Sequence, residues 1–111
     1  MGNAEVVESY FAAIRARDAE AVAARFSPDA ELVTAAGTFR GPAEIAGFYR
    51  DLAFRVADLW PEPGLLVVDG DRVAVEIDLR VNGAPTRAGD FFTLRDGRIT
   101  RLVIYAGPSP A

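Results

Sequence analysis

The sequence predicts one α+β domain in which helices from the N-terminal half pack on a curved, mainly antiparallel sheet. Helical spacing of apolar residues dominates before Trp60, two-residue alternation dominates after it, and turn signals separate the later segments. A twisted sheet with helices on one face curls around them, so the enclosed space is either core or pocket. We place the domain at residues 1–106 and a flexible tail at residues 107–111.

Two helices are predicted at the start of the chain. The first carries apolar residues one turn apart, at Val7, Phe11 and Ile14. Asn3 is a suitable N-cap for it, and Asp18 is placed to cap a second helix whose apolar stripe reaches Phe26. Pro28 lacks an amide hydrogen and restricts the residue before it, so we end the second helix there.

A third helix is predicted after two short strands at residues 30–34 and 38–39. Gly41 and Pro42 begin it, because proline suits the first turn of a helix. Helical spacing then continues through Ile45, Phe48, Tyr49, Leu52, Val56, Leu59 and Trp60. We therefore extend this helix to about Trp60, where a segment rich in proline ends it.

The remainder of the chain is predicted to form antiparallel strands. Residues 72–81 alternate, with Val75 and Ile77 on one face and Glu76 and Asp78 on the other. Asn82-Gly83 is a strong hairpin signal, since both residue types tolerate positive φ. Further strands are expected at residues 65–68, 91–94 and 99–105.

Composition excludes several classes of function. The net charge of −4 argues against a nucleic acid or an anionic membrane as partner. The chain has no cysteine and no histidine, which removes disulfides, thiolate nucleophiles, serine–histidine devices and the commonest metal ligands. We expect no metal and no cofactor. No apolar run reaches membrane-spanning length and the N-terminus lacks a secretion signal, so a cytoplasmic location is the default expectation.

Several segments together resemble the nuclear transport factor 2-like superfamily, in particular its SnoaL-like and ketosteroid isomerase-like branch. They include residues 6–14 (VVESYFAAI), 26–30 (FSPDA), 40–42 (RGP), 48–49 (FY), 89–94 (GDFFTL) and 96–99 (DGRI). The resemblance implies a cone, in which three helices pack on a strongly bent mixed sheet around one apolar pocket. It also implies a homodimer. The superfamily hosts isomerases, cyclases, hydrolases, dehydratases and non-enzymes, so it indicates fold more specifically than function.

The same resemblance suggests site residues. In ketosteroid isomerases, a tyrosine and a neutral aspartic acid donate hydrogen bonds to the developing enolate, and a second aspartate moves the proton. By position, the donors are Tyr10 and Asp90, with Tyr49 as the supporting tyrosine. The position of the base is occupied by Thr34, which cannot act as one. The epoxide-hydrolase arrangement of the superfamily is matched only at Asp78, so we discount that chemistry.

Each of these residues also has a structural interpretation. Asp90 shares one strand face with Phe92 and Leu94, where burial would raise its pKa, and this is the interpretation that we favour; the alternative is that it points to solvent at the start of the strand or caps a loop. Tyr10 and Tyr49 lie on helix stripes, where most aromatic residues simply pack. Other carboxylates that could replace the missing base lie at Asp29, Glu31, Asp58, Glu62, Glu76 and Asp78. The last two are better suited to cross-strand pairing with arginine or to a dimer face.

Two functional hypotheses follow, and both have a small hydrophobic molecule, such as a steroid- or polyketide-like compound, as partner. The first is a cofactor-free isomerase or cyclase that stabilises an enolate through Tyr10 and Asp90. The second is a non-catalytic binding or accessory domain, favoured by Thr34 at the base position. A weaker third is a purely structural dimerisation module. The expected ligand-binding wall, from strand parity and helix stripes, comprises Phe26, Thr34, Phe48, Val75, Ile77, Phe92, Leu102 and Ile104.

Overall fold

A computed structural model describes residues 2–108 and has the predicted α+β architecture. The helices are α1 (Asn3–Arg15), α2 (Ala19–Ala23), α3 (Gly41–Asp51) and the 3₁₀ turn η1 (Ala53–Arg55). The strands are β1 (Phe26–Thr34), β2 (Gly37–Arg40), β3 (Glu62–Pro63), β4 (Val67–Asp69), β5 (Arg72–Val81), β6 (Ala84–Arg95) and β7 (Arg98–Pro108).

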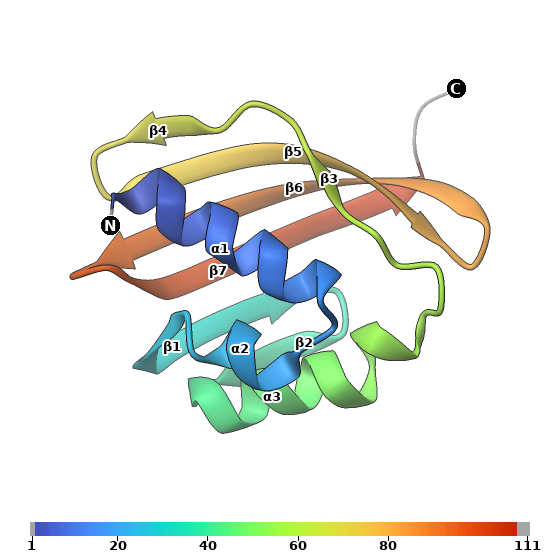
Figure 1. Ribbon diagram of the computed structural model, residues 1–111, viewed down its shortest axis with the longest axis horizontal. Helices are drawn as coiled ribbons and strands as arrows, with labels where there is room; N and C mark the ends of the chain where they lie inside the picture. Colours follow the sequence, from blue (N-terminus) through green and yellow to red (C-terminus); the bar gives the residue numbers. More distant parts are fainter. Residues whose placement is uncertain (1, 109–111) are drawn as a thin grey trace.

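All of these strands belong to one curved, mixed sheet with the order β2-β1-β7-β6-β5-β3, and β4 also pairs with β5. Among the strand pairs of residues 2–108, only β1–β7 is parallel, and the other pairs are antiparallel. The helices lie on one side of the sheet, with α1 across β5 to β7 and α3 beside β1 and β2 (Figure 1). This is the bent sheet around helices that the sequence predicted.

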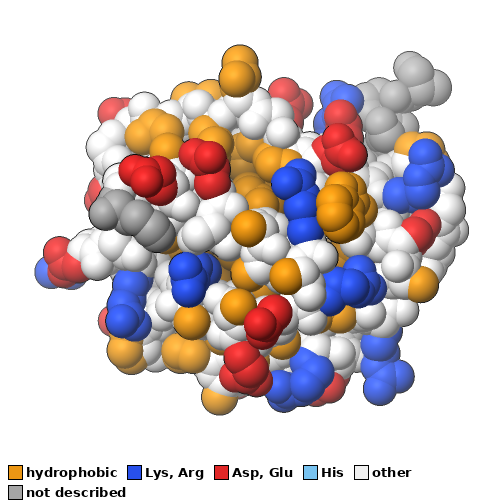
Figure 2. Space-filling view, viewed as in Figure 1, with side chains coloured by type: hydrophobic (Ala, Val, Ile, Leu, Met, Phe, Trp, Pro, Cys, Tyr) orange, Lys and Arg blue, Asp and Glu red, His pale blue; other side chains and the backbone are white. Residues whose placement is uncertain are grey.

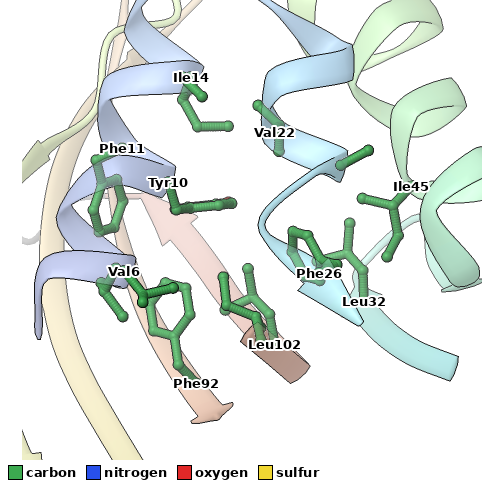
Figure 3. Packing of buried hydrophobic residues seen from close by; sticks show 14 of the residues in the cluster. Val6, Tyr10, Phe11, Ile14, Val22, Phe26, Leu32, Ile45, Phe92 and Leu102 are labelled. Atoms are coloured by element: carbon green, nitrogen blue, oxygen red, sulfur yellow. The ribbon is translucent and has the colours of Figure 1, made fainter. Parts of the chain in front are cut away.

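The core lies between the helices and the inner face of the sheet. Side chains from α1, including Val6 and Phe11, point toward Phe92 of β6 and Leu102 of β7 (Figure 3). The largest fully buried side chains are Phe26, Phe92, Leu32, Ile45, Leu94, Ile99 and Leu102. Burial of so many large apolar groups is the main contribution to the stability of a domain this small.

The N-cap residue of α1 differs from the prediction, whereas that of α2 agrees with it. Gly2, not Asn3, is the N-cap of α1, and Asn3 instead donates its side-chain amide to the Gly70 carbonyl, 2.9 Å away. Asp18 caps α2 as predicted, by accepting a hydrogen bond from the Ala21 amide.

The region after α2 is strand rather than helix. Phe26, which the sequence placed on the second helix, begins β1 and pairs with Ile99 of β7. The β1–β7 register is irregular between Phe26 and Glu31, and this interval contains Pro28. Proline cannot donate to a sheet ladder but is tolerated at such an irregularity, so it does not end the strand.

The third helix ends at Asp51, and its predicted extension to Trp60 is wrong. Residues 52–61 form a segment with only the η1 turn as regular structure, followed directly by β3; we call this segment the strap. A helix would use its carbonyls internally, but those of Phe54, Val56 and Leu59 accept hydrogen bonds from the Arg17 side chain. Long-range bonding has therefore replaced the local helical pattern.

The hairpin and the exposed face of β5 match their predictions. Asn82 and Gly83 have φ of 51° and 82° and join β5 to β6. Asp78 pairs across the strands with Arg87, at 3.1 Å.

The last strand runs to Pro108, so Gly107 and Pro108 lie in β7 rather than in the expected tail. The rest of that tail lies outside the described residues.

The two sides of the molecule differ in character. On the side that carries the helices, charged side chains of both signs are scattered among hydrophobic ones (Figure 2). On the outer face of the sheet, large apolar side chains are exposed, including Phe91 and Tyr105. In the part of the chain from Gly2 to Pro108, no helix combines the length and the apolar character required to cross a membrane.

Candidate functional site

Two buried tyrosines form the centre of the candidate site. Tyr10 comes from α1 and Tyr49 from α3, and their hydroxyl groups share a hydrogen bond. Burial raises the pKa of each phenol above its ordinary value, so both are neutral. Each buried phenol thus has the partner that it requires, and the bond fixes α1 relative to α3.

Asp90 is the buried carboxyl group of the site. It lies on the inner face of β6, with 3% of its surface exposed. Its Oδ1 atom is buried and has no hydrogen-bond partner among the described residues. Burial raises the pKa of Asp90 to about 8, so the side chain is mostly a neutral acid at pH 7 and can donate a hydrogen bond.

The three polar side chains adjoin a cavity of about 130 Å³. Its wall is otherwise apolar and is assembled from α1, α3, the strap and the sheet. The lining residues are Tyr10, Phe11, Ile14, Phe48, Tyr49, Ala53, Leu59, Pro61, Ile77, Leu79, Ala88, Asp90 and Ile104. An apolar cavity with a few polar groups gathered in it is the usual form of a small-molecule site.

The predicted wall is only partly the observed one. Phe48, Ile77 and Ile104 line the cavity. Phe26, Val75, Phe92 and Leu102 are buried in the core and do not line it. Alternation identified the inner face of each strand correctly, but α1 covers part of that face, and the ring of Phe92 packs 5.4 Å from that of Tyr10. Strand alternation therefore predicted which side chains face the helices, but not which of those side chains line the cavity.

Thr34 does not line the cavity, contrary to expectation. It lies at the end of β1 beside the β1–β2 turn, where its hydroxyl group donates to the Gly37 carbonyl and accepts from the Ala36 amide. Those bonds hold the side chain in the hairpin. The position that the resemblance assigned to the base is therefore a turn residue in this chain.

None of the alternative carboxylates lines the cavity either. Glu31 pairs with Arg40, and Asp29 accepts a hydrogen bond from Ser27. Asp58 accepts from the amides of Asn82 and Gly83, at 2.8 and 2.7 Å, and these hydrogen bonds lower its pKa. Asp90 is thus the only carboxyl group in the described cavity wall. In the described part of the chain, no group of three or more metal-ligating side chains comes together.

Sequence reasoning missed several lining residues for different reasons. Phe11 and Ile14 were recognised as a helix stripe, and Ala88 shares the parity of Asp90, so a signal for them existed. Leu59 was placed on the apolar stripe of a helix that does not extend that far, and Pro61 had no signal, because it was interpreted as the end of that helix. Their part in the wall depends on how the strap folds back over α1.

Residues 7–102 match the model of the SnoaL-like domain family. A candidate polyketide cyclase from Sinorhizobium meliloti is 31% identical, with a TM-score of 0.84 over 91% of this chain and 94% of that one. TerC, crystallised with polyporic acid, is 28% identical, with a TM-score of 0.83 over 93% and 89%. A candidate ketosteroid isomerase from Kribbella flavida is 19% identical, with a TM-score of 0.85 over 98% and 80%, and shows the fold alone. No curated protein matches the chain.

Proposed function

Because the chain belongs to the SnoaL-like domain family of the nuclear transport factor 2-like superfamily, we propose that its cavity binds a small ring ketone or enol and stabilises the oxyanion of that ligand. The observation that carries the proposal is the buried carboxyl group of Asp90, unpartnered at Oδ1, in an otherwise apolar wall next to the Tyr10–Tyr49 pair. A buried polar group without a partner is costly unless a ligand satisfies it.

The chemistry follows from the protonation states. When a proton leaves the carbon beside a carbonyl group, its electron pair moves into the new C–C double bond and charge gathers on the oxygen. Tyr10 and a neutral Asp90 then act as hydrogen-bond donors to that oxygen, in a cavity whose wall is otherwise apolar. Return of the proton to a more distant carbon gives the conjugated ketone.

The size of the cavity narrows the ligand class. A cavity of about 130 Å³ is close to the roughly 150 Å³ that accommodates one benzene ring. A four-ring steroid does not fit while the wall keeps this arrangement. We therefore propose a single-ring ligand in place of the steroid- or polyketide-like molecule expected from the sequence.

A second candidate function is binding without catalysis. The observation that favours it is the lack of a second carboxylate in the described wall, because Asp90 cannot be the neutral donor and the base at once. In the catalytic version, a base from solution, such as a buffer carboxylate ion, accepts the proton and returns it to the more distant carbon. In the binding version, the protein holds an enol or phenol and forms no product.

Isomerisation of 3-cyclohexen-1-one to 2-cyclohexen-1-one, followed by the ultraviolet absorbance of the conjugated product, tests the catalytic version. We expect the wild-type protein to catalyse it, and Tyr10→Phe and Asp90→Asn each to lower turnover by about 100-fold, the effect of losing one oxyanion donor. Tyr105→Phe is the matched control, since this exposed tyrosine lies on the outer face of the sheet.

The outcomes separate the two candidates. Saturable binding of 4-methylphenol without isomerisation, and without exchange of the ketone's α-hydrogens in D₂O, would select the binding version. Turnover that survives Tyr10→Phe and Asp90→Asn as well as it survives Tyr105→Phe would contradict the assigned donors.

We also propose that two copies of the chain pair through the outer face of the sheet. Leu65, Val67, Phe91 and Tyr105 are exposed there, and the rings of Phe91 and Tyr105 pack edge to face at 5.9 Å. Register places Glu76 and Arg101 on the same face as Phe91. A patch that carries apolar groups and both signs of charge can be complementary to its own two-fold copy.

Sedimentation velocity tests this pairing. The mass obtained for the wild-type protein should be twice the 11.9 kDa of one chain, and the mass obtained for Phe91→Arg should be that of one chain. Leu52→Arg, an equally drastic change at an exposed leucine on the helical side, should leave the dimer intact. A wild-type monomer would rule the pairing out.

A further inference from the structure

The strap, residues 52–61, forms one side of the central cavity. It contributes Ala53, Leu59 and Pro61 to the wall. Beyond the η1 turn it has little regular structure of its own, so its position depends on bonds to other parts of the chain. Figure 1 shows it running from the end of α3 past the end of α1 to the sheet edge. Whatever holds the strap therefore sets the width of the cavity.

Arg17 holds the middle of the strap. One guanidinium nitrogen, Nη1, donates to the Leu59 carbonyl at 3.1 Å. The second terminal nitrogen, Nη2, donates to the Phe54 and Val56 carbonyls at 2.9 and 2.7 Å. The guanidinium group also lies over the Phe54 ring, 5.5 Å from its centre. One side chain outside the cavity thus bonds three of the ten strap residues through their backbones.

The backbone of Arg17 is unusual for its residue type. Its φ is 55°, in the left-handed region, and it follows Ala16, the C-cap of α1. Glycine is the common residue at this position after a helix, because other side chains are strained there. In this chain the position carries the side chain that clamps the strap, and strained residues of this kind often have such a role.

Two further attachments hold the later part of the strap. Arg15 donates twice to the Pro61 carbonyl, at 3.1 and 2.8 Å, and lies over the Trp60 ring. The Asp58 carboxylate binds the amides of the β5–β6 hairpin. Loss of Arg17 would therefore remove the hydrogen bonds to the Phe54, Val56 and Leu59 carbonyls while both of these attachments remain.

We propose that Arg17 is a specificity-determining residue, which keeps the cavity at single-ring size by clamping the strap against the end of α1. The size limit rests on the proposed function of the cavity, whereas the clamp itself does not. Arg17 touches no ligand in this proposal and acts only through the position of the strap. It follows that releasing the clamp should change which ligand is preferred more than how tightly the small ligand binds.

Arg17→Gly tests this directly, since glycine adopts the observed backbone without strain and the variant should fold. Titration calorimetry with 4-methylphenol and 2-naphthol gives the ratio of the two affinities. We expect the ratio to shift by at least about 10-fold toward 2-naphthol in the variant. Hydrogen exchange of the bonded strap amides of Arg55, Val56 and Leu59 should become at least about 10-fold faster.

Arg50→Ala is the matched control. Arg50 borders the same surface hollow as Arg17 and Phe54, but its hydrogen bonds and ion pairs go to Glu20 and Asp51 and not to the strap. This variant should keep both the affinity ratio and the exchange rates of the wild-type protein.

The two readouts separate the clamp from the proposed function. Unchanged strap exchange in Arg17→Gly would overturn the clamp, whatever the ligand results. Faster exchange with an unchanged affinity ratio would overturn the role in specificity. If the wild-type protein binds neither phenol, the proposed function and the size limit fail together, and the exchange rates still decide whether Arg17 holds the strap.

Discussion

Between pH 5 and pH 8, we expect the free energy of unfolding of Asp90→Asn to increase relative to that of the wild-type protein, by about 1.4 kcal/mol for each pH unit. The reason is the buried carboxyl group. In the folded protein, burial raises the pKa of Asp90 to about 8, against an ordinary value of 3.8. The unfolded chain therefore releases this proton near pH 4, whereas the folded chain keeps it to about pH 8.

The sign follows from which state binds more protons. Between the two pKa values the folded state holds one proton more, so rising pH favours the unfolded state. The stabilisation of the folded state by the raised pKa of Asp90 is fully present below about pH 4 and is lost as the pH rises through about 8. Its total is on the order of 5 kcal/mol, a large fraction of the stability of a small domain. Asparagine does not titrate and has no such loss.

Urea denaturation at intervals from pH 5 to pH 9 measures the effect. The difference between variant and wild type should widen to about pH 8 and then level off. Asp78→Asn, at an exposed carboxylate on the neighbouring strand β5, serves as control and should stay within about 0.5 kcal/mol of a constant offset. Parallel curves for Asp90→Asn and the wild-type protein would show that Asp90 is ionised in the folded state.

The second large effect is expected from Leu102→Ala, which should lower the free energy of unfolding by about 2–5 kcal/mol. Leu102 lies on β7 opposite Phe92 and has 0% of its surface exposed. Its removal leaves a void that the surrounding side chains fill only in part. Because Leu102 does not line the cavity, the affinity for 4-methylphenol should change little in the protein that remains folded.

Leu52→Ala is the control for this prediction, because it is the same chemical change at a leucine with 51% of its surface exposed. It should cost less than about 1 kcal/mol. Denaturant midpoints of both variants and calorimetric titration with 4-methylphenol provide the measurements. A stable Leu102→Ala protein with strongly altered affinity would restore the sequence-based assignment of Leu102 to the ligand-binding wall.

Local sequence signals predicted most of the sheet correctly. Alternation in β5 and β6 depends only on the two-residue period of a strand, so the inner face with Ile77 and Asp90 could be identified without a structure. The Asn82-Gly83 turn depends on the backbone freedom of those residue types, which is also a local property.

The ends of elements were less predictable. The apolar spacing through Trp60 is a valid helical pattern, but the three carbonyls bonded by Arg17 belong to residues at least 37 positions away in sequence. No local pattern records such a bond. The same applies to Phe26, whose partner Ile99 is on the last strand.

The sequence by itself determined the fold class and the faces of the strands. Its resemblance to ketosteroid isomerases indicated Tyr10, Tyr49 and Asp90, the three polar side chains that the structure brings to one cavity. Only the tertiary structure decided the extent of that cavity, its closure by the strap, and the exclusion of Phe26, Thr34, Val75, Phe92 and Leu102 from its wall. The physical reason is that periodicity reports the direction of a side chain relative to its own strand or helix. The distance of that side chain from a cavity depends on packing between segments far apart in the chain.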